Sequence, residues 1–362
     1  MGLLVTELSL ADFRSFERLE VTLSPEVTVF VGPNAAGKTN TVEALQLLTS
    51  GQSFRRPAPA QLVREGAASA RAAARLEGDG RVLDARLDVV SGRRQFFRNG
   101  KRCQAADMPE ALMSVLFTPD DLALVKSGAS ARRGELDDFG RQANRGYANV
   151  LLAYQRSVEQ RNRLLKEEVP DEGLLAAWDA SVALGGATLL HARLRLFSRL
   201  ARRVSEVYAR VAGGERLECS YSCTLGEGVE DLTRDELRDV FLDALERGRA
   251  EDLARRQTCV GPHRDDVVFE IEGRDARHFG SQGQQRTVAL ALKMAEVDLA
   301  GEILGSRPLL LLDDVMSELD AARRDAVMGY VREGIQTVVT TTNLGYFSPE
   351  LLERAEVVRF GE

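Results

Sequence analysis

The sequence is poor in the residues that build disulfide frameworks and zinc sites. Its 362 residues include only four cysteines and three histidines. No two of the cysteines form a CxxC pair, and they stand at Cys103, Cys219, Cys223 and Cys259. Neither a zinc site nor a disulfide scaffold is therefore favoured, and reduced thiols suit the cytoplasm, where we expect this protein to be.

Long apolar runs are also missing. No stretch of the sequence reaches the length that a membrane-spanning helix needs. The first residues, MGLLVTELSL, lack the basic region followed by an apolar block that marks a signal peptide. We expect no membrane partner.

Positive charge is not in excess either. The formal net charge is −7, which argues against indiscriminate binding to nucleic acid, although a negative total can conceal a basic face. Hydrophobic residues make up 44% of the chain, enough for a full core. The length indicates two domains, or one large domain with an insertion.

The strongest motif is GPNAAGKT, which lies between an apolar run, Val27 to Val31, and a helical pattern, Asn40 to Leu48. A strand, a glycine-rich loop and a helix in this order hold phosphate groups on backbone N–H groups and the positive end of the helix dipole. A chance glycine turn is the alternative, but the flanking pattern favours a nucleotide site. The expected binding residues are Gly32, Pro33, Asn34, Ala35, Ala36, Gly37, Lys38, Thr39 and Asn40.

Two side chains of this loop have distinct expected roles. Lys38 would reach the β- and γ-phosphate oxygens, and Thr39 would place its hydroxyl on Mg²⁺. We therefore expect ATP and Mg²⁺ as cofactors.

The second motif is a pair of acidic residues that follows the apolar run Leu309 to Leu312. Such a run suits a strand that is buried on both faces. Asp313 would hold Mg²⁺ together with Thr39, and Asp314 would orient or deprotonate the attacking water. A buried strand that simply ends in a polar turn is the alternative, and the phosphate loop argues against it.

The segment Phe279 to Arg286 precedes a helical pattern, Thr287 to Leu299. Ser281 and Gln284 have the spacing of a capping box, so a well-formed helix start is the plain interpretation. The same geometry also presents a hydroxyl and free N–H groups to an anion.

Arg14 lies in the turn between two expected strands near the phosphate loop. Its planar guanidinium suits triphosphate oxygens. A solvated turn arginine explains its position equally well.

A basic hairpin is predicted around Asn99-Gly100, a dipeptide that favours a two-residue turn. Cations interleaved with Phe96 and Phe97 suit a nucleic-acid surface, where rings stack on bases. A solvated hairpin whose phenylalanines face the core is an equal alternative. The candidate DNA-binding residues here are Arg93, Arg94, Arg98, Lys101 and Arg102.

The middle of the chain, from about Ser130 to Arg256, is mainly helical in pattern. We expect helices over Tyr147 to Lys166 and Leu174 to Val211, the second with an interruption or bend at Gly185-Gly186. Sustained heptads are missing, so a compact lid or arm is expected and not a long coiled coil. A solvated face or a DNA contact would explain the basic residues of the second helix, Arg195, Arg199, Arg202 and Arg203.

Taken together, these motifs resemble the ATP-binding-cassette (ABC) ATPases of DNA repair and chromosome maintenance, and within them the RecF family. GPNAAGKT corresponds to the first nucleotide motif, Ser281 to Gln285 to the signature, LLLLDD to the second nucleotide motif and Ser317 to Asp320 to the D-loop. Four further segments resemble RecF in particular: Asp12 to Phe16, Gln52 to Arg55, Thr118 to Asp121 with Arg132-Arg133 downstream, and Gly261 to Arg264.

The resemblance implies an α/β fold: an ABC-type P-loop ATPase head with a mixed sheet, and an inserted, mainly helical arm. The head would combine residues 1–118 and 258–362, and the arm would span residues 119–257. ATP would close a homodimer in which Ser281, Gly283 and Gln284 of one protomer meet the nucleotide held by the other. The implied function is ATP-dependent binding to gapped or junction DNA in recombinational repair, with RecO and RecR as partners that help load recombinase.

The sequence also departs from the family pattern. Gln282 follows the signature serine, and Asp314 stands where many cassette ATPases have glutamate. The strand ending at Thr341-Thr342 offers no histidine beside the γ-phosphate. We therefore expect weak, DNA-stimulated ATP hydrolysis.

Two other classes of function remain open. A transport ATPase subunit would need the same nucleotide motifs, although the arm and the RecF-like segments argue against it. In a nucleotide-regulated scaffold, partner proteins would bind the DNA.

Overall fold

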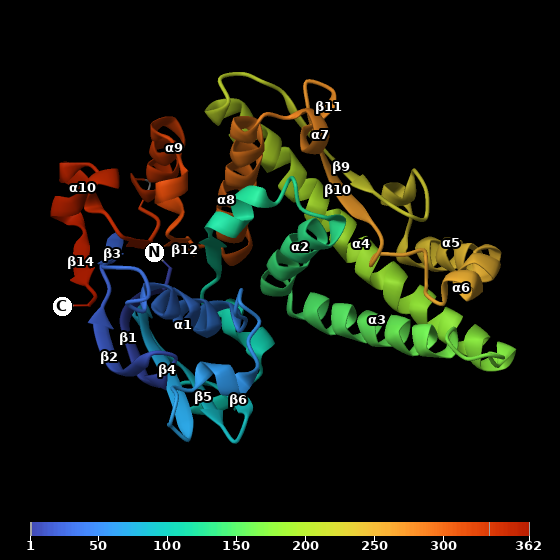
Figure 1. The fold of residues 1–362 in the computed structure, drawn as a ribbon, viewed down its shortest axis with the longest axis horizontal. Coiled ribbons are helices and arrows are strands. Elements are labelled where there is room, and N and C mark those ends of the chain that lie inside the picture. Colours follow the sequence, from blue (N-terminus) through green and yellow to red (C-terminus); the bar gives the residue numbers. More distant parts are fainter. Residues whose placement is uncertain (1, 333, 362) are drawn as a thin grey trace. The chain divides into compact units, whose positions relative to one another are not determined.

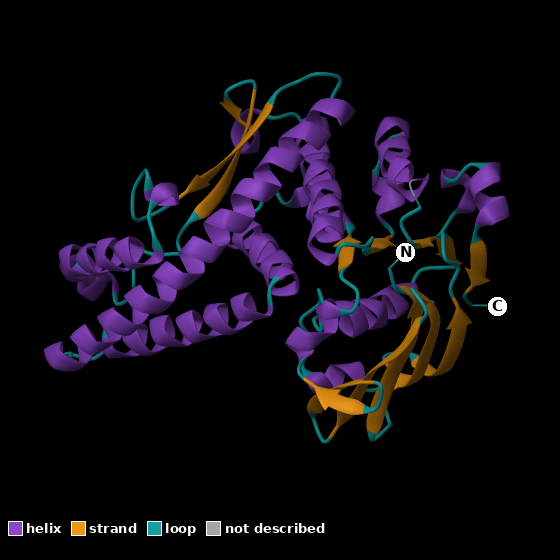
Figure 2. Cartoon of the chain, turned by 180° about the vertical axis from the view of Figure 1, so that it is seen from behind, coloured by secondary structure: helices purple, strands orange, loops and turns teal. Residues whose placement is uncertain are grey.

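The computed structural model describes residues 2–332 and 334–361, and they form two compact units (Figure 1). The first unit combines residues 1–122 and 290–362, and the second comprises residues 123–289. Figure 2 shows that both large sheets belong to the first unit and that the second is mainly helical.

The first unit contains a six-stranded antiparallel sheet with the order β2-β1-β4-β5-β6-β7. Apolar residues alternate with polar ones along β4, so that Ala70, Ala72, Ala74 and Leu76 point into the core. The strands are β1 (Leu4–Phe13), β2 (Phe16–Thr22), β4 (Ser69–Gly78), β5 (Arg81–Val90), β6 (Arg93–Arg98) and β7 (Lys101–Cys103).

A five-stranded parallel sheet with the order β14-β3-β13-β12-β8 forms the rest of the frame. Every residue of β3, β12 and β13 is buried, as expected for strands covered on both faces. The strands are β3 (Val27–Val31), β8 (Ser114–Phe117), β12 (Leu309–Asp313), β13 (Thr337–Thr341) and β14 (Glu356–Arg359).

Helix α1 (Lys38–Ser50) lies between the two sheets and contacts strands of both (Figure 1). Its apolar residues Val42, Leu45 and Leu48 are buried in one continuous core with residues of both sheets. Helices α8 (Gln282–Leu304), α9 (Ala321–Arg332) and α10 (Pro349–Arg354) follow later in the chain.

The predicted α/β class is confirmed. The antiparallel strands of the head form one sheet, and the parallel strands form a second, separate sheet. The first expected domain boundary, after residue 118, lies close to the observed division after Leu122. The second differs: residues 258–289 group with the helical unit, and the division falls after Ala289, inside α8. The physical reason is that β10 (Asp266–Ile271) pairs along its length with β9 (Leu217–Ser222) of that unit.

The second unit is built on a helical hairpin, α3 (Arg145–Leu164) and α4 (Glu172–Val211). A three-stranded antiparallel sheet, β11-β10-β9, completes it. The other elements are α2 (Ala129–Ala143), α5 (Arg234–Arg247), α6 (Arg249–Arg255), β11 (Arg274–Asp275) and α7 (Ala276–Phe279). No long coiled coil is present in the described chain, as predicted.

Helix α4 runs without a break through Gly185-Gly186, so the interruption predicted there is wrong. Gly186 is required by packing: a Cβ at this position would lie 2.1 Å from a ring carbon of Phe241 and 2.9 Å from one of Tyr154. Among the described helices, α4 alone is long and apolar enough to cross a membrane by length and composition, so the expectation that no stretch reaches this length is wrong. Here it packs against α3, α5 and β9.

Two buried arginines join the elements of this unit. Arg161 of α3 is fully buried and donates to Asp179 of α4 and Asp252 of α6, each at 2.6 Å. Arg193 of α4 pairs with Asp137 of α2 at 2.9 Å. Because an unpaired buried charge is costly, each arginine fixes the positions of its partner elements.

The RecF-like segment Gly261 to Arg264 packs against the helical hairpin of α3 and α4. The Tyr154 hydroxyl and His263 Nδ1 share a hydrogen bond of 2.6 Å. Burial lowers the pKa of His263 to about 4, so its ring is neutral at pH 7. A Cβ at Gly261 would lie 2.3 Å from the Phe241 ring, so glycine is also required here.

We predict opposite effects for alanine at the two adjacent glycines. Gly186→Ala would force its methyl group into Phe241, and we expect a loss of about 1–3 kcal/mol from overpacking. The nearest neighbour of a methyl group in Gly185→Ala is Tyr154, at an ordinary contact distance of 3.6 Å, so this variant should be stabilised by up to about 1 kcal/mol through helix propensity. The urea midpoint for unfolding of the second unit, measured for each variant and for the wild type, gives both changes in stability. Equal shifts in the two variants would contradict the packing argument.

Candidate nucleotide-binding site

The phosphate loop connects β3 to α1 in a conformation that two glycines permit. A Cβ at Gly32 would lie 2.4 Å from the carbonyl oxygen of Phe360, and one at Gly37 would lie 2.4 Å from the Phe16 ring. Gly37 also has a φ of 101°, in the left-handed region. The loop therefore leads directly into α1. The Asn40 N–H donates to the Gly37 carbonyl at 2.8 Å, so the first-turn donors that suit an anion are the N–H groups of Lys38 and Thr39.

Lys38 starts α1 and is buried inside the loop. Its ammonium donates to the carbonyl oxygens of Gly32 at 2.8 Å and Pro33 at 2.9 Å. These bonds place a positive charge within the curve of the loop, where phosphate oxygens would need it.

Asp313, at the carboxyl end of β12, meets the loop through two hydroxyl groups. Its Oδ1 accepts hydrogen bonds from Thr39 at 3.0 Å and from Thr340 of β13 at 2.7 Å. Burial raises the pKa of Asp313, and the two donated hydroxyls oppose that shift. The structure thus brings together Thr39 and Asp313, the two residues predicted to hold Mg²⁺, and adds Thr340.

Asp314 follows with a φ of 53°, a left-handed conformation that aspartate tolerates. Its Oδ1 is buried without a hydrogen-bond partner in the described part of the chain. Burial raises the pKa of Asp314, against the opposing charge of Lys38. An acceptor without a partner beside a lysine and an aspartate fits a site for a metal-bound or attacking water, so these residues fit ATP with Mg²⁺.

Ser281 precedes α8 as the predicted capping box. Its Oγ accepts from the Gln284 N–H at 3.2 Å, and Gln284 Oε1 accepts from the Ser281 N–H at 2.9 Å. The Gln284 amide also donates to Glu215. Ser281 is exposed, and Gly283 is half-buried in the first turn. Their contact with a second protomer's nucleotide remains a prediction.

Arg14 is held by protein groups. Its Nε and Nη2 donate to the two oxygens of Glu43 at 2.8 and 2.7 Å, and its Nη1 donates to the Gln61 carbonyl at 2.8 Å. Each of its three nitrogens is therefore engaged, and the structure gives Arg14 a structural role. A contact with triphosphate remains only a prediction.

Glu43 was not predicted from the sequence. This α1 carboxylate is fully buried and also accepts from the Ser53 hydroxyl at 2.6 Å and from Arg55 at 3.3 Å. Arg55 further donates to Asn40 at 2.8 Å, next to the phosphate loop. The available signal was a single charge within the apolar run TVEAL, because a buried charge requires partners.

The basic hairpin is partly committed to the protein. Phe96 is buried in the core, and Phe97 lies under the guanidinium of Arg86, 4.2 Å from its ring centre. Arg94 donates to the Pro57 carbonyl. Arg98 pairs with Glu110 at 2.9 Å. The exposed candidates left on this hairpin are Arg93, Lys101 and Arg102.

Of the basic residues considered on α4, Arg195, Arg199 and Arg202 are exposed as well, and Arg203 is half-buried with an interaction within the chain. Arg195 points to solvent, and Arg202 lies 3.6 Å from Glu206 in a surface ion pair. Arg199 is exposed but has an interaction within the chain. The structure therefore leaves the choice between a DNA contact and a solvated face open at α4.

Replacing the buried carboxylate should destabilise the head. We predict that Glu43→Gln costs about 3–5 kcal/mol, because it removes one partner of a buried ion pair. Glu77→Gln, at an exposed pair with Arg75 in the same unit, is the matched control and should have little effect. Urea unfolding of the two variants tests this, and similar midpoints would show that the Glu43 pair contributes little.

The chain resembles known proteins over nearly its whole length. Residues 4–350 match the family model described as RecF/RecN/SMC N terminal domain. A protein of Symbiobacterium thermophilum named DNA replication and repair protein RecF is 42% identical over 347 residues, 94% of this chain and 92% of that protein. A protein of the same name from Heliobacterium modesticaldum is 38% identical over 98% of this chain and 96% of its own length.

Solved structures agree with this assignment. The recombination mediator protein RecF with ATPrS, in the RecFOR pathway, superposes with a TM-score of 0.89 at 31% identity, covering 96% of this chain and 94% of that chain. The same protein with ATP gives a TM-score of 0.87. An Smc head domain from Pyrococcus furiosus, at 18% identity and a TM-score of 0.56, shares the fold. The chain belongs to the RecF family of DNA replication and repair proteins, in the RecF, RecN and SMC group of ATPases.

Proposed function

We propose that this protein is an ATP-switched DNA clamp of recombinational repair in the cytoplasm. It dimerises on ATP at gapped or junction DNA and, with RecO and RecR, helps load recombinase. The observation that carries the nucleotide part is the meeting of Lys38, Thr39 and Asp313 at one end of the parallel sheet. Membership in the RecF family supports the DNA and partner parts.

The roles of the nucleotide residues follow from their positions. Lys38 and the first-turn N–H groups of α1 neutralise phosphate charge, and Thr39 with Asp313 holds Mg²⁺, which supplies a positive charge to the phosphates. Asp314 orients the attacking water. Its side chain is one methylene shorter than the glutamate of many cassette ATPases, so we expect slow hydrolysis that DNA stimulates.

Dimer closure requires a definite free-energy difference. Moving a two-state equilibrium from mostly open to mostly closed takes about 5.5 kcal/mol. Hydrogen bonds to charged groups contribute about 1.5–3 kcal/mol each, so roughly two to four bonds made only to the triphosphate suffice. The exposed Ser281 hydroxyl and the N–H groups at the start of α8 would supply them across the dimer.

DNA contact is assigned to the exposed cations. Arg93, Lys101 and Arg102 stand on one hairpin, and Arg195 and Arg202 stand on α4. Arg94 and Arg98 are held by Pro57 and Glu110 and are weaker candidates. A scaffold whose partners bind the DNA is the second candidate function, because the hairpin arginines are partly engaged by the protein itself.

The switch predicts ATP-dependent dimerisation. Analytical ultracentrifugation should show a dimer with ATP and a monomer with ADP. Ser281→Arg should abolish the dimer by placing a bulky cation at the interface, and Lys38→Met should abolish it through loss of nucleotide. Ser130→Arg, which adds the same charge at an exposed serine of α2, should leave it intact. A wild-type monomer in every nucleotide would refute the switch.

The DNA surface predicts a change in salt dependence. Replacing Arg93, Lys101 and Arg102 by glutamine should weaken binding to gapped duplex and lower the slope of log K against log salt by roughly one per lost phosphate contact. In the control variant, glutamine replaces three exposed arginines of the same sheet that each pair with an acidic residue, namely Arg18, Arg75 and Arg81. Replacing Arg195 and Arg202 by glutamine and measuring the same slope tests whether the arm contacts DNA. Unchanged slopes in both sets would favour the scaffold.

A further inference from the structure

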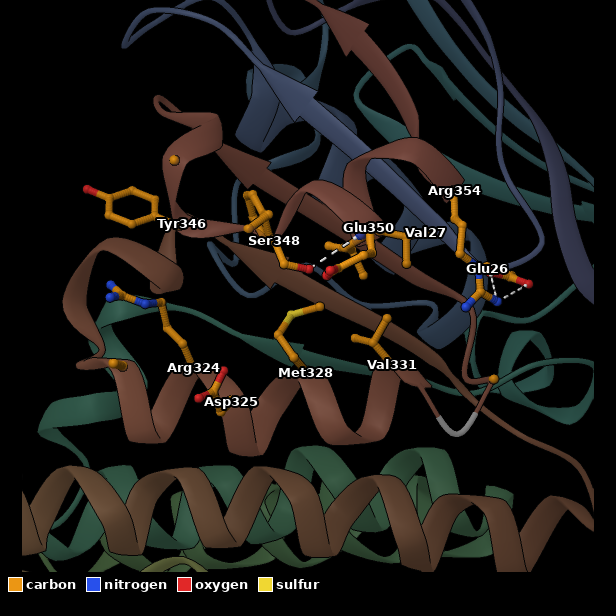
Figure 3. A pocket seen from close by; sticks show the side chains of 15 residues that line it. Glu26, Val27, Arg324, Asp325, Met328, Val331, Tyr346, Ser348, Glu350 and Arg354 are labelled. Carbon is orange, nitrogen blue, oxygen red and sulfur yellow. Dashed lines mark hydrogen bonds and ion pairs between the residues drawn. The ribbon is translucent and has the colours of Figure 1, made fainter.

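A pocket of about 460 Å³ lies in the head unit, apart from the nucleotide residues (Figure 3). One wall is the face of α9 that follows the predicted D-loop. The opposite wall is the segment that runs from η6 (Leu344–Tyr346) into α10, and Glu26 and Val27 close one end. No residue of the phosphate loop, and neither Asp313 nor Asp314, lines it.

The floor of the pocket is apolar. Its apolar lining comprises Met328 and Val331 of α9, Val27 of β3, and Phe347 and Leu351 from the opposite segment. Figure 3 shows Met328, Val331 and Val27 together at the pocket. Met328, Val331 and Phe347 are each 5–7% exposed, so they are packed from below and open only to the pocket. Its volume lies in the range of sites that enclose a ligand of a few side chains, and it is too small for a folded domain.

The free charge at the rim is negative. Of the two arginines, Arg354 is neutralised by Glu26 at 2.7 Å. Asp325 and Glu350 are exposed, and neither has a partner among the described residues. They stand on opposite walls, Asp325 on α9 and Glu350 on α10 (Figure 3).

Arg324, the other arginine, is already bound. It donates to the carbonyl oxygens of Leu319 at 2.9 Å and Met316 at 3.5 Å, and its guanidinium lies 5.2 Å from the centre of the Tyr346 ring. These contacts hold its charge against the backbone of the predicted D-loop. The partners of Arg324 are neutral, so it keeps its positive charge. With Arg354 neutralised by Glu26, Arg324 together with Asp325 and Glu350 leaves one net negative charge at the rim, which disfavours a phosphate or carboxylate ligand.

We propose that this pocket is a docking site for a short basic segment of a partner protein. One or two bulky apolar side chains of the segment enter between Met328 and Leu351. Lysine or arginine side chains on either side of this anchor pair with Asp325 and Glu350. The charge of the rim selects against acidic segments, and the apolar floor selects against segments without an anchor.

Three synthetic peptides test the proposal by fluorescence anisotropy on the full chain. The first is Lys-Lys-Leu-Phe-Lys-Lys, the second has glutamate in place of lysine, and the third has two glycines in place of Leu-Phe. We expect the first to bind at least tenfold more tightly than either of the others. Equal binding of the first and third peptides would mean general charge attraction and would overturn the proposal, as would no binding of the first at millimolar concentration.

Matched variants locate the binding. The double variant Asp325→Lys with Glu350→Lys should weaken the first peptide at least tenfold and remove the preference over the glutamate peptide. Glu353→Lys, an exposed acid of α10 that does not line the pocket, is the control and should bind like the wild type. Wild-type binding by the double variant would overturn the proposal. Self-association of the wild type that the double variant loses would assign the pocket to a second copy of this chain instead.

Discussion

The carboxylate of Asp313 is the point on which the nucleotide site depends. It accepts the hydroxyls of Thr39 and Thr340, which belong to segments hundreds of residues apart in the sequence. This meeting is possible because β3, β13 and β12 are adjacent and parallel, so their carboxyl ends share one edge of the sheet. A shift in the pairing of any of these strands would separate the phosphate loop from its acidic partner.

The sequence was sufficient to predict that the phosphate loop and Asp313 lie together, because each chemical role in such a site requires a particular residue type at a fixed spacing. Gly37, Lys38 and Thr39 follow a buried strand, and Asp313 ends another. Glu43 and Arg55 could not be predicted in the same way. Their pairing depends on where the loop after α1 returns in three dimensions, and no local periodicity encodes that return.

The glycines of α4 and the arginines of the basic hairpin also show that a local sequence pattern does not predict tertiary contacts. Gly185-Gly186 has the local pattern of a helix break, yet tertiary packing against Phe241 explains Gly186 within a continuous helix. The Asn99-Gly100 dipeptide predicted the basic hairpin correctly, but the local sequence did not distinguish Arg94, which reaches the Pro57 carbonyl, from the exposed Arg93. Which cations remain free depends on neighbours that are distant in sequence.

The order of strands in the parallel sheet has a consequence for synthesis. The strand β3 is made early, but both of its neighbours, β13 and β14, come from the last part of the chain. During translation neither edge of VTVFV has a neighbouring strand until β13 is made, by which time the residues of the second unit have already been made. The parallel sheet therefore forms around β3 only after β13 and β14 have been made, and a ribosome that stalls before β13 leaves an aggregation-prone strand without its neighbours.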